Sequence, residues 1–207
     1  GIGPEICLKA ALDPAVRAAC DPIVVSDPGV IERHAKACSL AVNMLAGRGY
    51  EVVAVSGKPE ADAYLHEIGA SQILRRQSLD LGSKPMEAAL WAGAVDNVGG
   101  EVLTWLTRTL GYGGNIASVG LAASHELHTT VMPFILRGVN LLGINSVATP
   151  RELRLAVWHR LATDLRPTGL DRIAGRHVTF DELPAQFDDY IKGRVIGRTV
   201  VRIAKNT

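Results

Sequence analysis

The chain has 207 residues, a net charge of +1 and 47% hydrophobic residues, the composition of an ordinary globular protein. This length suggests one large domain or a domain and a half. The near-zero charge gives no reason to expect binding to nucleic acid or an anionic membrane. No apolar run approaches the ~20 residues that span a bilayer, and no signal-peptide pattern opens the chain. We therefore expect a cytoplasmic protein, although Gly1 is not a natural start and leaves open a missing upstream segment.

Short β-rich runs alternate with amphipathic helices along the chain. Ile31, Ala35, Cys38, Val42 and Leu45 are spaced by four, three, four and three residues, which forms one continuous helical face. Strands are expected at 23–25, 51–56, 72–74, 94–96, 115–119 and 139–146, and helices at 28–46, 59–68, about 103–110 and about 150–161. This alternation predicts an α/β protein: a Rossmann-like, doubly wound, mainly parallel sheet of about six strands in three α/β/α layers.

Three further features of the pattern carry structural expectations. Thr149-Pro150-Arg151-Glu152 is typical of a capping box, with proline at the first helical position. Tyr64 and Trp158 occur at helical spacing with other apolar residues and are expected in the core, whereas Trp105 stays open. An additional helix is expected at about 4–20. Residues 177–180 and 198–203 are expected to be extra β pieces, which either pair with each other or are loosely held.

Several segments, in order, resemble one protein family, and the resemblance covers about residues 39–203. They are Gly49–Gly57, Trp91–Asp96, Thr129–Arg137, Leu142–Val147 and Gly197–Val201, of which Thr129–Arg137 is the most specific. The family is the acryloyl-CoA reductase and quinone oxidoreductase branch of the medium-chain dehydrogenases/reductases. The resemblance implies zinc-independent reduction of an activated C=C bond with NADPH. Members begin with a separate catalytic domain that has no counterpart here, so the resemblance also implies a catalytically incomplete chain.

Residues 1–38 resemble a different family. Gly1–Ile6 and Asp21–Gly29 are similar to the N-terminal part of 4-hydroxythreonine-4-phosphate dehydrogenase. All three cysteines also fall within these residues, and their odd number argues against a disulfide framework. We therefore expect a chimera in three parts: residues 1–38 of separate origin, a dinucleotide-binding remainder at 39–166, and C-terminal β pieces at 167–207.

The turn after the first expected strand is unusual for a dinucleotide site. Such sites use a Gly-rich turn whose amides meet the pyrophosphate at a helix N-terminus. Here the turn is Ser26-Asp27-Pro28-Gly29. Pro28 has no amide hydrogen to donate, and Asp27 would cap the helix itself. This turn is therefore interpreted first as a capped helix start, which leaves open whether a cofactor still binds.

The second expected strand ends where a cofactor ribose would lie. An acidic residue there selects NAD, but this chain has Ser56-Gly57-Lys58. Neutral and basic groups suit the 2′-phosphate of NADPH, and Arg76 matches a basic position of the family after the next strand. Ser56, Lys58 and Arg76 are therefore candidate cofactor-binding residues. The alternative is that Lys58 and Arg76 are solvated surface charges.

Later strand ends provide the remaining candidates. Gly120-Leu121 and Asn145-Ser146 follow two expected strands, and ligands of such sheets bind beyond the carboxyl ends of the strands. The resemblance places these segments near the nicotinamide. It also places Arg198 near the cofactor, although an ordinary edge-strand arginine fits equally well.

No residue can be assigned as a catalytic acid or base. His125-Glu-Leu-His128 lacks the His-Glu-x-x-His spacing of a zinc site, and no metal is expected. Two functions therefore remain: an NADPH-binding part of an oxidoreductase, or a non-enzymatic, engineered or recombined α/β scaffold. In either case, apolar surface left by the missing domain could support self-association.

Overall fold

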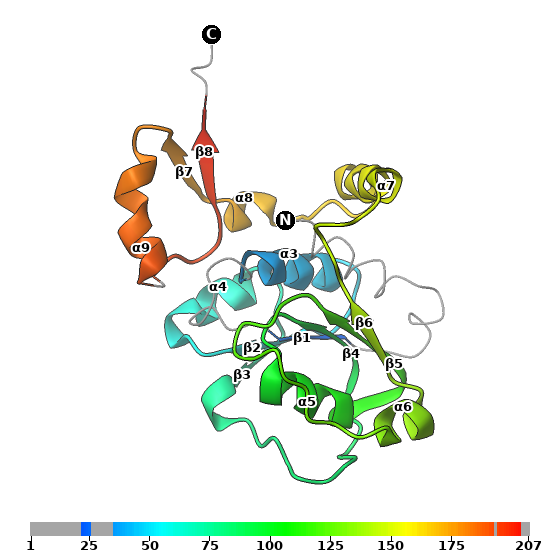
Figure 1. Ribbon diagram of the computed structural model, residues 1–207. Helices are drawn as coiled ribbons and strands as arrows, with labels where there is room; N and C mark the ends of the chain where they lie inside the picture. Colours follow the sequence, from blue (N-terminus) through cyan, green and yellow to red (C-terminus); the bar gives the residue numbers. More distant parts are fainter. Residues whose placement is uncertain (1–21, 26–34, 193, 204–207) are drawn as a thin grey trace.

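The computed structural model describes residues 22–25, 35–192 and 194–203 (Figure 1). Its main feature is a six-stranded sheet in the order β3-β2-β1-β4-β5-β6, and every neighbouring pair in it is parallel. The first strand lies in the centre of this order. The next two strands are added on one side of it and the last three on the other, which is the doubly wound arrangement of a Rossmann fold. The predicted α/β class and the number of strands are therefore confirmed.

The elements follow the chain in simple alternation. The strands of the main sheet are β1 (Pro22–Val25), β2 (Val53–Ser56), β3 (Gln72–Arg75), β4 (Trp91–Asp96), β5 (Leu110–Ser118) and β6 (Asn140–Gly143). The helices between and after them are α3 (Ala35–Ala46), η1 (Pro59–Ala61), α4 (Asp62–Glu67), η2 (Arg76–Ser78), α5 (Gly100–Thr109), α6 (Met132–Arg137) and α7 (Arg151–Ala162). None of the helices in the described ranges is both long and apolar enough to cross a bilayer.

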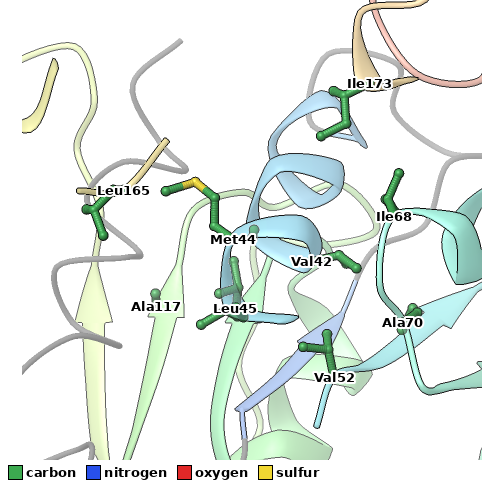
Figure 2. Packing of buried hydrophobic residues seen from close by; sticks show 12 residues of the cluster. Val42, Met44, Leu45, Val52, Ile68, Ala70, Ala117, Leu165 and Ile173 are labelled. Atoms are coloured by element: carbon green, nitrogen blue, oxygen red, sulfur yellow. The ribbon is translucent and has the colours of Figure 1, made fainter. Parts of the chain in front are cut away.

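Helices cover both faces of the sheet, with α3 and α4 on one face and α5 and α6 on the other (Figure 1). Alternate residues of each strand enter opposite layers of the core, as the pleat requires. On β2, Ala54 packs on the α3 side, while Val53 and Val55 pack on the α5 side. The α3 side also holds Val42 and Leu45 (Figure 2). This alternation confirms the predicted three layers.

The C-terminal part forms a second, smaller unit. It contains α8 (Leu170–Ile173), β7 (Arg176–Thr179), η3 (Leu183–Gln186), α9 (Phe187–Ile191) and β8 (Thr199–Arg202). β7 and β8 pair in parallel as a separate two-stranded sheet, so the extra β pieces pair with each other. Asn43 of α3 helps to attach this unit, because its Oδ1 accepts the amide of Gly169, just before α8, at 2.9 Å. Its Nδ2 donates to the Ile68 carbonyl, which follows α4.

Three strand boundaries of the main sheet differ from the prediction by three residues or more. β4 begins at Trp91, three residues early, and β5 begins at Leu110 because these two residues pair across the strands. Leu110 was expected on the buried side of a helix, but it is the first residue of a strand. β6 is only four residues long, because Asn145 folds back: its Oδ1 accepts the amides of Val147 and Ala148 at 3.1 Å. Tertiary pairing overrides the local pattern at the starts of β4 and β5, whereas a local turn ends β6.

The expected capping box at α7 is wrong. Thr149 does not cap the helix; its hydroxyl donates to the Asn145 carbonyl instead, and Pro150 occupies the N-cap position. Trp158 of the same helix was expected in the core, yet 52% of it is exposed. Trp105, which the sequence left open, is buried on α5 and meets Trp91 edge to face at 5.9 Å between ring centres. The expected helix at 4–20 and the turn at 26–29 lie outside the described residues.

Candidate functional site

The turn that leaves β2 is shaped by its own hydroxyl group. Ser56 is buried, and its Oγ accepts the Lys58 amide at 3.1 Å. Lys58 is only 8% exposed, so the interpretation of it as a solvated surface charge is wrong. The Gln77 side-chain amide donates to the Gly57 carbonyl at 3.3 Å, which connects this turn to the segment after β3. Lys58 is therefore a cationic side chain placed at the carboxyl edge of the sheet.

Two consecutive arginines leave the neighbouring strand. Arg75 ends β3 and binds the carboxylate of Asp62, the first residue of α4, through both of its terminal nitrogens. Hydrogen bonding from Arg75 is the main reason why the pKa of Asp62 lies below its usual value of 3.8, and the charge of Arg75 adds to it. Arg76 is half-buried and lines a cavity. The structure therefore places Arg76 beside the turn that carries Lys58.

A buried carboxylate holds the loop after β4. Asp96 is completely buried; its Oδ1 accepts the Val98 amide at 3.1 Å, and its Oδ2 accepts the Gly99 amide at 3.0 Å. Burial raises the pKa of Asp96 from 3.8 to about 6, although both backbone amides favour the charged form. This carboxylate therefore fixes the backbone that leads into α5.

Glycine allows the loops after β4 and β5 to touch. Gly99 has a φ of +70°, and a side chain there would collide with the Ser124 carbonyl. A Cβ on Gly120 would lie 2.7 Å from the Asn97 carbonyl oxygen. In the space that is left, the Ala123 amide donates to the Val98 carbonyl at 2.8 Å. Gly120 therefore acts first by permitting close approach of two loops, as Gly does where backbones meet.

A cavity of about 380 Å³ lies where these segments converge. Its wall is formed by the residue after β3, the loop after β4, the first turn of α5 and the loop after β5. The lining residues are Arg76, Gln77, Leu81, Val98, Gly99, Gly100, Glu101, Val102, Ala123 and Ser124. The first turn of α5 contributes Gly100, Glu101 and Val102 to this wall, and a helix N-terminus favours negative charge. A cavity with an arginine and a helix N-terminus suits an anionic group of a ligand.

The remaining candidates do not line this cavity. Leu121 is 64% exposed, and its Cα lies close to Gly99. Asn145 and Ser146 follow β6, which neighbours β5 along the same edge of the sheet. Asn145 uses its side chain to fold the local turn, and Ser146 accepts a hydrogen bond on its carbonyl from Arg154 at 3.1 Å. These residues therefore extend the carboxyl edge of the sheet away from Arg76.

Arg198 lies elsewhere, next to the α4 layer. Its amide donates to the Ile173 carbonyl at 2.6 Å, and the preceding Gly197 approaches the Tyr64 ring. Burial raises the pKa of Tyr64, and the nearby charge of Arg198 partly opposes this. The structure therefore places Arg198 at the connection between the main sheet and the C-terminal unit.

Sequence reasoning missed the loop after β4. Asp96 and Gly99 were interpreted only as the end of a strand. The rule that selected Gly120 and Asn145, a position at the carboxyl end of an expected strand, applies equally to them. A polar residue followed by two glycines at the carboxyl end of a buried strand was the available signal. Gln77 and Ser124 had no such signal, because only the fold brings them to the cavity wall.

No three histidine, cysteine, aspartate or glutamate side chains gather as metal ligands within the part of the chain that the structure describes. His128 approaches Glu126 at 3.1 Å, but both side chains are mostly exposed and no third ligand joins them. The described residues therefore do not fit a zinc ion, and no chemistry is assigned to one.

Comparison with known proteins identifies relatives. A profile described as zinc-binding dehydrogenase matches residues 38–163. The chain is 45% identical over 166 residues to an acrylyl-CoA reductase of Ruegeria pomeroyi, a match that covers 80% of this chain and 50% of the relative. A protein of Escherichia coli K12 described as a probable acrylyl-CoA reductase is 39% identical over 203 residues, covering 98% of this chain and 60% of the relative.

A solved structure is similar to this chain in both sequence and fold. The yhdH oxidoreductase of Salmonella enterica in complex with NADP has a TM-score of 0.86 and 39% identity, covering 99% of this chain and 61% of that one. The chain thus spans about half to three-fifths of the length of these relatives.

The resemblance to a second family is shorter. A 4-hydroxythreonine-4-phosphate dehydrogenase of Trichlorobacter lovleyi is 38% identical over 45 residues, which is 22% of this chain. Since the Escherichia coli match extends over 98% of the chain, a separate origin of residues 1–38 stays unconfirmed. The matched profile covers well over half of the sequence, and the chain therefore belongs to the zinc-binding dehydrogenase family of the medium-chain dehydrogenases/reductases.

Proposed function

We propose that this chain is the NADPH-binding part of an oxidoreductase that reduces an activated C=C bond of the acryloyl-CoA or quinone type. The names of the relatives support this class of reaction, and NADP is bound in the Salmonella structure. NADPH supplies the hydride when it is bound; the protein binds and orients it. None of the described residues is assigned as a catalytic acid or base, and the chain by itself is proposed to be catalytically incomplete.

The observation that carries the proposal is the cavity beside Arg76. It lies beyond the carboxyl edge of a doubly wound sheet, where such folds bind nucleotides. We propose that Lys58 and Arg76 bind the 2′-phosphate, with Ser56 holding the turn that carries Lys58. Gly120, Leu121, Asn145 and Ser146 are proposed to lie along the nicotinamide end. A contact of Arg198 with the cofactor is proposed from the resemblance alone; in the fold, Arg198 lies near Tyr64.

Calorimetric titration with NADPH, with NADH as the control ligand, tests the proposal. Micromolar binding, on the order of −8 kcal/mol, is expected for NADPH, with weaker binding of NADH. Lys58→Met and Arg76→Gln should each weaken NADPH binding by about tenfold, because each removes a charge-assisted contact to phosphate. Lys192→Met, which removes an exposed lysine that pairs with Asp188, should change neither affinity. Absence of NADPH binding to the intact chain would contradict the proposal.

The second candidate is a recombined scaffold that folds without binding a cofactor. Its support is the short match to 4-hydroxythreonine-4-phosphate dehydrogenase and the Asp27-Pro28 turn in the sequence. The division at residues 38 and 166 belongs to the same hypothesis. The titration separates the two candidates directly, since only the scaffold predicts no heat with either dinucleotide.

We also propose self-association through apolar surface on the C-terminal unit, in a protein of the cytoplasm. Phe180, Phe187, Ile191 and Ile203 are each more than half exposed. An exposed group of large apolar side chains of this kind usually marks an interaction surface. Sedimentation velocity over a range of protein concentrations is expected to show a concentration-dependent dimer or larger species. A monomer at every concentration would argue against this surface as a site of self-association.

A further inference from the structure

A bidentate ion pair connects the two ends of the segment that joins α4 to the end of β3. Asp62 begins α4 and Arg75 ends β3. Arg75 Nη1 donates to Asp62 Oδ1 at 2.8 Å, and Arg75 Nη2 donates to Asp62 Oδ2. Each side chain is 34% exposed, so this pair is better shielded from solvent than the other arginine–carboxylate pairs of the described residues. Two parallel bonds fix the relative orientation of the two groups as well as their distance.

The pair joins the two segments that carry the basic candidates. Lys58 ends the turn that leads through η1 into Asp62, and Arg76 directly follows Arg75. The main sheet also aligns the segments of Lys58 and Arg76, because Ser56 of β2 and Arg75 of β3 are paired in the strand register. The Gln77–Gly57 hydrogen bond makes a second, weaker connection. Three contacts therefore join the segments that carry Lys58 and Arg76, and the ion pair is the charged one among these three.

We propose that Asp62 and Arg75 are positioning residues that set the spacing between Lys58 and Arg76, and that this spacing determines the preference for a dinucleotide with a 2′-phosphate. The inference rests on the proposed function. Two cations near one another repel, so their joint use by one phosphate requires the backbone beneath them to be held. Arg75 directly precedes Arg76, and Asp62 lies one helical turn after Lys58, so the pair holds this backbone without itself touching the phosphate.

Asp62→Asn gives the decisive test, because charge and geometry predict opposite results. Removal of a negative charge near a phosphate site would by itself strengthen NADPH binding. Loss of the two-pronged contact should instead weaken NADPH binding by roughly twofold to fivefold and leave NADH binding unchanged. Arg75→Gln should do the same. The charge-swapped double variant, Asp62→Arg with Arg75→Asp, should return the ratio of the two affinities toward that of the unmodified chain.

Asp164→Asn is the matched control. It removes the same charge from another arginine–aspartate pair, Arg160–Asp164, at the end of α7, and should leave both affinities unchanged. The measurements are calorimetric titrations of both dinucleotides, with thermal unfolding of every variant. Equal weakening of NADPH and NADH in Asp62→Asn, an unchanged ratio, or tighter NADPH binding would each overturn the inference. If the unmodified chain binds neither dinucleotide, the proposed function fails first.

Discussion

Replacement of Arg137 by methionine is expected to lower the free energy of unfolding by about 3 kcal/mol, through loss of charge-assisted hydrogen bonds. Arg137 ends α6, and its guanidinium donates to three backbone carbonyls from different parts of the chain. These are Arg108 at 3.0 Å, Leu110 at 3.1 Å and Glu87 at 2.5 Å. Methionine keeps the apolar stem but leaves all three oxygens without this donor. The side chain thus holds the end of α5, the start of β5 and the loop before β4 together.

Denaturant unfolding measures this effect. Arg151→Met is the matched control, because Arg151 is exposed in the first turn of α7 and its replacement should change stability by less than about 0.5 kcal/mol. Arg137→Lys should lie between the two, since a single ammonium cannot reach three carbonyls in the planar geometry of a guanidinium. A loss below about 1 kcal/mol in Arg137→Met would mean that solvent replaces these bonds almost fully.

The stability of the protein is expected to fall by about 3 kcal/mol through Asp96 as the pH rises from about 4 to about 6. Burial raises the pKa of this carboxyl from 3.8 to about 6 in the folded chain. Between these two values the folded state keeps a proton that the unfolded state has released. Raising the pH through this interval therefore favours the unfolded state, and the effect is complete once both states are ionised.

Other carboxylates act in the opposite direction. The pKa values of Asp62, Asp164, Glu182 and Asp189 are lowered by their hydrogen bonds, so their contributions are present at neutral pH and are lost as the pH falls through their folded-state values. Asp96→Asn isolates the buried carboxyl. The amide oxygen can still accept the Val98 and Gly99 amides, but it does not titrate.

Unfolding in denaturant at several pH values between 4 and 7.5 checks this expectation. The difference in stability between Asp96→Asn and the unmodified chain should shift in favour of the variant by about 3 kcal/mol across the interval and then stay constant. Parallel curves for the two proteins would show that folding does not raise the pKa of Asp96. Because Asp96 holds the loop that forms the cavity wall, NADPH binding is the second property to follow over the same pH range.

The carboxyl edge of the sheet shows how much of the candidate site the residue pattern could predict. Ser56, Lys58 and Arg76 were selected because they follow strands, and the fold places them on adjacent segments joined by Gln77. Their surroundings were not predictable: Lys58 is buried rather than solvated, and Arg76 meets α5 across a cavity. Arg198 was selected by resemblance alone, and the fold places it near Tyr64. Local spacing fixes which strand end a residue follows, but not which helix covers it.

The layers of this protein follow from its residue pattern. Alternation of short apolar runs with helical faces is sufficient to specify a parallel sheet between two helix layers, because each pattern has one face that must be buried. The starts of β4 and β5, the burial of Asp96 and the pairing of Asp62 with Arg75 were not predictable from the pattern. They depend on contacts between residues far apart in the chain, whose energies no local pattern contains. The early end of β6 and the uncapped start of α7 have a different cause: they follow from local hydrogen bonds of Asn145, which compete with the strand and with the capping box.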